Sequence, residues 1–243
     1  MNHILIIMAM EAEAKPIINH LDLNPLGKLD DNLQSLAFSG KINETRITLV
    51  INGKDKRFGV DSIGTVPASI ATFSAIKRFN PDLVISAGTC GAFKNKGSKI
   101  GDVYLSTVFK NHDRRISIPE FDKYGIGNYQ SANFEHLIDE IGLKKAVVSS
   151  GNSLDMCDTD MDIINENESV VKEMEAAGIA WVAEQFSTPF VALKSVTDLV
   201  DGELEAHEEF LINLEKASKA LKEKVIAFLE LLTKKDIKEK LLV

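Results

Sequence analysis

Apolar segments with the periods of strands and helices alternate along the chain. Continuous apolar runs of four to eight residues predict buried strands, and alternating runs predict half-buried ones. By these patterns we expect strands over residues 3–10, 34–39, 46–52, 82–87, 103–108, 145–150 and 189–196. The short connection between the second and third strands contains residues 40–43, so we expect these two strands to form a hairpin.

Other segments repeat their apolar residues every three or four positions, which predicts helices. The expected helices cover residues 11–20, 66–79, 134–141, 170–186 and about 207–232. In residues 66–79 we expect the apolar face to consist of Ile70, Phe73, Ile76 and Phe79.

Strands that alternate with helices predict an α/β fold with a central, mixed, mostly parallel twisted sheet flanked by helices. No linker or repeat divides the sequence, so we expect a single domain over residues 1–243. Residues 111–128 have no regular pattern, and irregular connections of that length are usually functional.

Composition excludes several classes of protein. The 36 Asp and Glu outnumber the 28 Lys and Arg, and this net charge of −8 argues against nucleic-acid binding, which needs a basic surface. The two cysteines and five histidines show no disulfide or metal spacing, so we expect no metal and no organic cofactor. Without an apolar run of membrane-spanning length or a secretion signal, we expect a cytoplasmic protein that does not bind membranes.

Acidic residues and glycines lie where the expected strands end, and ligands of parallel sheets bind at those ends. Glu13 follows the first strand, Gly88 to Gly91 follow the strand at 82–87, and Asp198 follows the last. Each residue also has a simple structural explanation. Glu13, like Glu11, is an acid that the helix dipole favours in a first turn, Cys90 is a small buried residue, and Asp198 is a helix cap.

Taken together, these positions predict a pocket with several carboxyl groups around a glycine turn. Cleavage of a glycosidic bond needs such an arrangement, because one acid protonates the leaving group and another activates water. A further carboxylate can accept two hydrogen bonds from a ribose diol. The sequence thus favours an enzyme that acts on a nucleoside.

Five motifs, in this order and spacing, resemble those of the nucleoside phosphorylase superfamily. They are MAMEAE at 8–13, SAGTCG at 86–91, SGNSL at 150–154, EME at 173–175 and VTD at 196–198. Within the superfamily the chain is most similar to the plant-type branch of the 5′-methylthioadenosine/S-adenosylhomocysteine nucleosidases. Residues 61–67, 112–115 and 194–202 carry that closer similarity.

The resemblance implies a hydrolase of methionine salvage that splits the N9–ribose bond and releases adenine and a 5-thio-ribose. It implies that Glu13 activates the attacking water, Asp198 protonates adenine N7, and Glu175 binds the ribose hydroxyls. It implies further contacts with the substrate from Met10, Thr89, Cys90, Gly91, Leu154, Asp155, Glu173, Met174, Lys194, Thr197 and His207.

The resemblance also implies a homodimer in which residues 112–127, with Ile118 and Pro119, close the pocket of the neighbouring chain. The sequence departs from the family pattern at three positions. Asn152 replaces a common aspartate, Leu154 replaces an aromatic residue, and His207 replaces an apolar residue near the 5′ end.

Two other functions stay open on the sequence. A purine nucleoside phosphorylase shares the fold, but phosphate needs cationic donors and Ser86 stands where phosphorylases carry an arginine. A nucleoside-binding protein without activity is the second alternative, although both Glu13 and Asp198 are present.

Overall fold

The computed structural model describes residues 1–234 and contains a mixed sheet of ten strands in that range. The predicted domain includes residues 235–243, which lie outside the described residues. The first strand, β1 (His3–Met8), is parallel to both of its neighbours, β4 (Thr45–Ile51) and β5 (Leu83–Ala92). β3 (Leu36–Ile42) pairs with β4 in the predicted hairpin. β2 (Asn24–Lys28) pairs with β3 at the edge.

The second half of the sheet closes on itself, which corrects the expected arrangement of one central twisted sheet simply flanked by helices. β5 is parallel to β10 (Phe190–Leu199), which is antiparallel to β6 (Val103–Asn111). β6 continues to β8 (Lys144–Ser150) and to β9 (Val171–Glu173), and β9 returns to β5. The ring of β5, β10, β6, β8 and β9 is a small barrel, and closing it leaves none of these strands as an unpaired edge. The short strand β7 (Tyr129–Gln130) pairs with β6 outside the ring.

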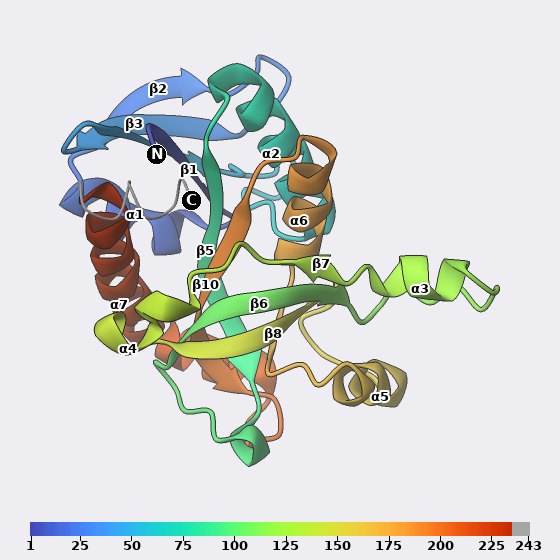
Figure 1. Cartoon of the computed structure of the whole chain (residues 1–243). Helices are drawn as coiled ribbons and strands as arrows, with labels where there is room; N and C mark the ends of the chain where they lie inside the picture. The colour runs from blue at the N-terminus through green and yellow to red at the C-terminus, as the bar shows by residue number, and fades with distance from the viewer. Residues whose placement is uncertain (235–243) are drawn as a thin grey trace.

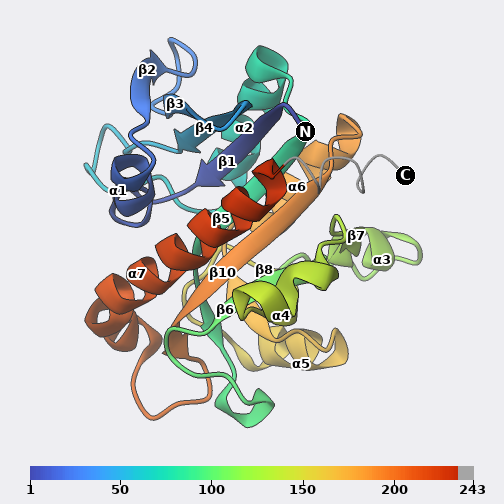
Figure 2. The ribbon, with the colours of Figure 1, turned by 60° about the vertical axis from the view of Figure 1, so that its left-hand side comes forward.

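Helices pack on both sides of this sheet (Figures 1 and 2). One apolar core joins one face of β1 to α1 (Glu11–His20) and the long α7 (Ala206–Thr233), with α4 (Ile138–Ile141) at its border. The other core joins the opposite face to α2 (Thr65–Phe79) and α6 (Ala176–Gln185). Side chains along β1 alternate between the two cores, because successive residues of a strand point to opposite faces.

Several elements differ from those expected. Residues 170–186 form β9 followed by α6, and the unpredicted helix α5 (Asp158–Glu166) precedes them. The segment expected to be irregular contains α3 (Phe121–Ile126), which projects from the body of the molecule in Figure 1. Residues 134–141 contain a 3₁₀ turn (Glu135–Leu137) before α4.

Helix α2 buries a different face from the one predicted. Its core-facing residues are Ala68, Ala71, Thr72, Ala75 and Ile76, whereas Ile70 and Phe73 are exposed. The small residues allow α6 to approach closely, since a Cβ on Gly178 would lie 2.7 Å from Ser69 Oγ. None of the helices within residues 1–234 is both long and apolar enough to cross a membrane.

Candidate active site

An open cavity of about 900 Å³, its mouth included, lies where β1, β5, β9 and β10 end. This is the location that the sequence predicts for a ligand site. Most of the predicted site residues line it: Met10, Glu13, Thr89, Cys90, Gly91, Leu154, Glu173, Met174, Glu175, Lys194, Thr197 and Asp198. The strand ends therefore bring together side chains that are far apart in the sequence.

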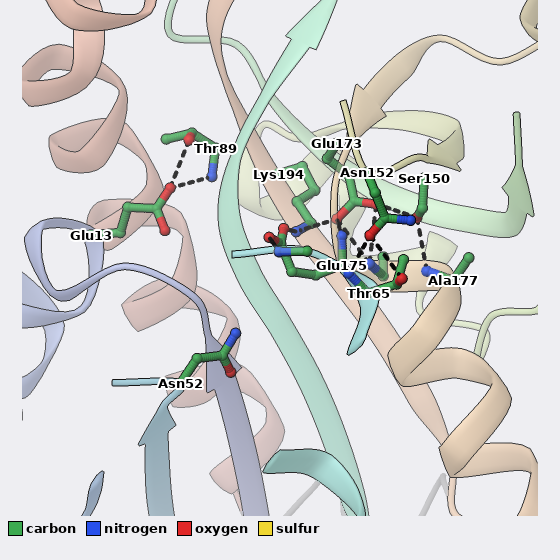
Figure 3. A network of polar contacts seen from close by, with 12 residues as sticks. Glu13, Asn52, Thr65, Thr89, Ser150, Asn152, Glu173, Glu175, Ala177 and Lys194 are labelled. Atoms are coloured by element: carbon green, nitrogen blue, oxygen red, sulfur yellow. Dashed lines mark hydrogen bonds and ion pairs between the residues drawn. The ribbon is translucent and has the colours of Figure 1, made fainter. Parts of the chain in front are cut away.

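Glu13 enters the cavity from the first turn of α1 and is almost completely buried. Its Oε1 accepts hydrogen bonds from the backbone N of Thr89 (2.8 Å) and from Thr89 Oγ1 (2.6 Å), as Figure 3 shows. Oε2 accepts no hydrogen bond from the described residues and lies near Gly88, within the cavity lining. Burial raises the pKa of Glu13, and the bonds from Thr89 oppose that shift. One oxygen is thus fixed by the protein while the other can accept a proton.

Asp198 is aimed into the cavity by an irregularity in the sheet. The register of β10 against β5 shifts between Val196 and Asp198, so Thr197 is the extra residue of a β-bulge. Thr197 Oγ1 donates to Asp198 Oδ1 at 2.8 Å. A Cβ at Gly91 would lie 2.6 Å from Asp198 Oδ2, so only glycine leaves room for this carboxyl group. Burial raises the pKa of Asp198, which favours the protonated form that a general acid needs.

A buried lysine and two glutamates of the cavity lining form a network of polar contacts (Figure 3). Lys194 Nζ lies 2.7 Å from Glu173 Oε2 and 4.0 Å from Glu175 Oε2. Glu173 also accepts hydrogen bonds from Ser150 Oγ and the backbone N of Ala176, so protein donors occupy its carboxylate. Glu173 therefore holds Lys194 in place and has little capacity left for a ligand.

The members of this network titrate differently. Although burial opposes ionisation of Glu173, the charge of Lys194 and its hydrogen bonds lower the pKa of Glu173. Burial, with a contribution from Glu173, raises the pKa of Glu175 to about 7, and Lys194 opposes that shift. Burial by itself would lower the pKa of Lys194, but the two glutamates raise it above its ordinary value. Of the two glutamates, Glu175 is thus the one whose charge can change near neutral pH when a ligand binds.

Four predicted site residues do not line the cavity among the described residues. Asp155 is exposed next to Leu154, and His207 is exposed in the first turn of α7. Phe210, one turn further along α7, lines the cavity instead. Ile118 and Pro119 are exposed on the loop before α3, away from this chain's own cavity.

Lys172 is a cavity residue that the sequence reasoning missed. It is buried, and its Nζ donates to the backbone oxygens of Ser153 (2.9 Å) and Leu154 (2.7 Å). Lys172 therefore holds the loop that places Leu154 at the cavity. The interpretation of residues 170–186 as one helix concealed it, because β9 was needed to point Lys172 inward.

The cavity offers neither a thiolate nucleophile nor a metal cluster. Burial raises the pKa of Cys90 well above its ordinary value, so the thiol is neutral. Throughout residues 1–234, no group of three or more His, Cys, Asp or Glu side chains is arranged to hold a metal ion. The chemical resources of the site are therefore carboxyl groups and backbone donors.

A partly closed mixed sheet with buried carboxyl groups around a glycine turn defines the nucleoside phosphorylase-like class of α/β proteins. The model of the Phosphorylase superfamily matches residues 3–230, and the chain belongs to this superfamily. A 5′-methylthioadenosine nucleosidase of Arabidopsis thaliana is 44% identical over 93% of this chain and 86% of its own length. A 5′-methylthioadenosine/S-adenosylhomocysteine nucleosidase of the same plant is 42% identical over 93% of this chain and 91% of its own.

Solved structures agree with these relatives. The apo structure of Arabidopsis thaliana 5′-methylthioadenosine nucleosidase superposes with a TM-score of 0.94 at 41% identity, covering 96% of each chain. A futalosine hydrolase of Helicobacter pylori, at 22% identity and a TM-score of 0.79, shares the fold. The family resemblance and the α/β class expected from the sequence are thereby confirmed.

Proposed function

We propose that this protein hydrolyses the N9–ribose bond of 5′-methylthioadenosine, and of S-adenosylhomocysteine, to adenine and a 5-thio-ribose. The observation that carries the proposal is the pair of buried carboxyl groups, Glu13 and Asp198, in one cavity with raised pKa values. The names of the Arabidopsis relatives at 42–44% identity support the same substrates.

The proposed reaction begins with proton transfer from Asp198 to adenine N7. The N9–C1′ bond then breaks, its electron pair stays on the base, and the sugar gains the character of an oxocarbenium ion. Water held by Glu13 Oε2 attacks C1′ and gives its proton to that carboxylate. Glu175 accepts hydrogen bonds from the ribose hydroxyls, and Met174 packs on the sugar.

The charges of the cavity favour water over phosphate as the nucleophile. Among the described lining residues the cations are Lys172 and Lys194. Lys194 is paired with Glu173, and Lys172 is bound to two carbonyl oxygens, so neither presents a free cation to phosphate. Glu13 and Glu175 would in addition repel an anion.

We expect adenine release from methylthioadenosine in phosphate-free buffer at a rate that added phosphate does not increase. Chromatography of the products, with and without inorganic phosphate, measures this directly. Formation of a sugar 1-phosphate, or turnover only when phosphate is present, would identify a phosphorylase instead.

We further propose that the enzyme is a homodimer built on the exposed apolar face of α2 and α6. Val66, Ile70 and Trp181 lie together on this face, and Trp181 is 41% exposed although tryptophan is usually well covered. Ile118 lies on the projecting loop before α3 and is 57% exposed. The proposed dimer places that loop, with Pro119, over the neighbour's cavity.

We expect light scattering to give a mass near twice the 26.7 kDa of one chain. Ile70→Glu places a charge in the apolar face and should yield a monomer with reduced activity, because the cavity then lacks the neighbour's loop. Leu26→Glu is the control, since Leu26 on β2 is as exposed as Ile70, at 45%. A monomeric wild-type protein with full activity would exclude the shared site.

We place this activity in the cytoplasm and in methionine salvage, where a cleaved sulfur nucleoside returns its adenine and its thio-sugar. The thiols of Cys90 and Cys157 are free, as a reducing compartment favours.

A further inference from the structure

An asparagine joins the start of α2, next to the cavity residue Ile63, to the segment that follows β6. Asn152, in the loop after β8, accepts at Oδ1 from the backbone N (3.0 Å) and the hydroxyl (2.9 Å) of Thr65. Its own backbone N and its Nδ2 donate to Asp113 Oδ2 at 2.6 and 3.2 Å. One residue therefore connects the start of α2 to the segment that follows β6; Figure 3 shows Asn152 beside Thr65 and Glu175.

The start of α2 also holds the carboxylate assigned to ribose. The backbone N of Gly64 donates to Glu175 Oε1 at 2.9 Å. The first N–H groups of a helix have no partner within the helix, and Gly64 offers no side chain of its own as a cap. Glu175 and Asn152, from two other elements, accept from these successive N–H groups. The position of Thr65 thus fixes the direction of the Gly64 N–H.

The backbone at this turn is tightly constrained. Gly64 has a φ of +102°, a conformation that favours glycine, and a Cβ there would lie 3.1 Å from Asn152 Oδ1. A displacement of Asn152 would shift Thr65, which it holds by two hydrogen bonds, and the peptide bond to Thr65 would pass the shift to Gly64, whose N–H binds Glu175.

The position requires an amide and not an acid. Oδ1 accepts from Thr65 while Nδ2 donates to Asp113, and only asparagine or glutamine supplies both functions. Asp113 Oδ1 is buried and has no hydrogen-bond partner within residues 1–234. A carboxylate at position 152 would face that of Asp113 with no added donor to offset the second negative charge.

We propose that Asn152, held by Asp113, is a positioning residue that fixes the Gly64–Thr65 turn and thereby the ribose-binding carboxylate of Glu175. The inference rests on the proposed function, in which Glu175 binds the ribose hydroxyls. Asn152 is outside the lining of the cavity and acts only through the turn.

The test compares Asn152→Asp with the double variant Asn152→Asp/Asp113→Asn, which exchanges the acid and the amide. Asn165→Asp, at an exposed position of α5, is the matched control for the added charge. Two quantities are measured: hydrogen exchange of the Gly64 and Thr65 amides, and kcat and KM for methylthioadenosine.

In Asn152→Asp we expect faster exchange at both amides and a KM raised about tenfold, with kcat changed less than about twofold, because a positioned hydrogen bond is lost. The double variant should restore both quantities, since the amide at position 113 can donate to the new carboxylate. Asn152→Ala, which adds no charge, should show the same loss without rescue by Asp113→Asn.

A KM that stays at the wild-type value while the amides exchange faster would overturn the positioning role. If the Gly64 and Thr65 amides exchange at the wild-type rate in both Asn152→Asp and Asn152→Ala, the contact between Asn152 and Thr65 does not hold the turn. If Asn152→Asp/Asp113→Asn is as impaired as Asn152→Asp, the loss does not come from repulsion between carboxylates at positions 152 and 113. A wild-type protein that releases no adenine would instead contradict the proposed function, and the exchange measurement would still decide whether Asn152 holds the turn.

Discussion

Asp198→Asn is expected to lower kcat for methylthioadenosine by about a hundred- to ten-thousand-fold, the usual contribution of a general acid. Asparagine has the shape and neutral charge of the protonated carboxyl group, and its oxygen can still accept from Thr197 Oγ1. It cannot transfer a proton to adenine N7. Substrate affinity, measured by calorimetry in the inactive variant, should therefore stay close to the wild-type value.

The pH profile separates this role from a structural one. Because burial raises the pKa of Asp198, the protonated and active form persists to higher pH than for an exposed aspartate. On the alkaline side, wild-type kcat should fall as pH rises through the pKa of Asp198, and the residual activity of Asp198→Asn should lack this alkaline decline. Asp201→Asn is the control, since Asp201 binds the backbone of Lys94 and Asn95 outside the cavity. Wild-type kcat in Asp198→Asn would contradict the mechanism.

The elements that the sequence predicts well are those whose pattern has one interpretation. Residues 11–20 form a helix with the predicted bounds, and the helix expected at about 207–232 is found at Ala206–Thr233. Long amphipathic repeats and short apolar runs between turns are local signals, so they identify these elements without knowledge of the tertiary contacts.

Barrel closure and the buried face of α2 are tertiary properties. The three residues of β9 are too few to show a period, yet they complete the ring between β8 and β5. Both faces of α2 carry apolar residues, and the alanine face is buried because α6 approaches through Gly178. The larger Ile70 and Phe73 remain on the outside, where the proposed dimer would cover them.

From the residue pattern alone the candidate site was predictable as a set of strand-end acids, and only the family resemblance assigned a role to each. Nothing local distinguishes Glu173 from Glu175, because their difference comes from Lys194 and Ser150 on other strands. The bulge at Thr197, which aims Asp198, depends on the register between β10 and β5. Phe210 has the spacing of a core position of its helix, and only the cavity reveals that it lines the site.

The acids of the cavity differ in pKa because their environments differ, and each pKa suits a different proposed role. Lys194 keeps Glu173 ionised, which makes it a fixed part of the scaffold. Burial raises the pKa of Glu175 to about 7, so this group changes charge near neutral pH and accepts from both ribose hydroxyls in the proposed mechanism when it is ionised. Burial also keeps a proton on Asp198 to a higher pH than for an exposed aspartate. In the proposed mechanism, carboxyl groups of the same kind would thus act as anchor, ligand and acid because their surroundings differ.

Glu13→Gln should lower kcat by about a hundred- to ten-thousand-fold, the range of a general base. Glutamine keeps the oxygen that accepts from the backbone N and the hydroxyl of Thr89, so the fold and the cavity should be retained. It replaces the free Oε2 with an amide nitrogen that donates hydrogen bonds, which cannot accept a proton from the attacking water. Steady-state kinetics together with the melting temperature measure the loss of activity and the retained stability.

Glu11→Gln is the closest control that the chain offers for this result. Glu11 lies in the same first turn of α1, but its carboxylate pairs with Lys54 at the surface, 3.2 Å away, and is half exposed. Glu11→Gln removes a surface charge that stabilises the helix N-terminus, so it should lower stability slightly. Burial raises the pKa of Glu13, so replacing this acid with a neutral side chain should leave stability unchanged. Only Glu13→Gln should lose turnover. Equal activities in the two variants would show that Glu13 does not activate the attacking water. Its role would then be structural, in α1, and the mechanism would lack a general base.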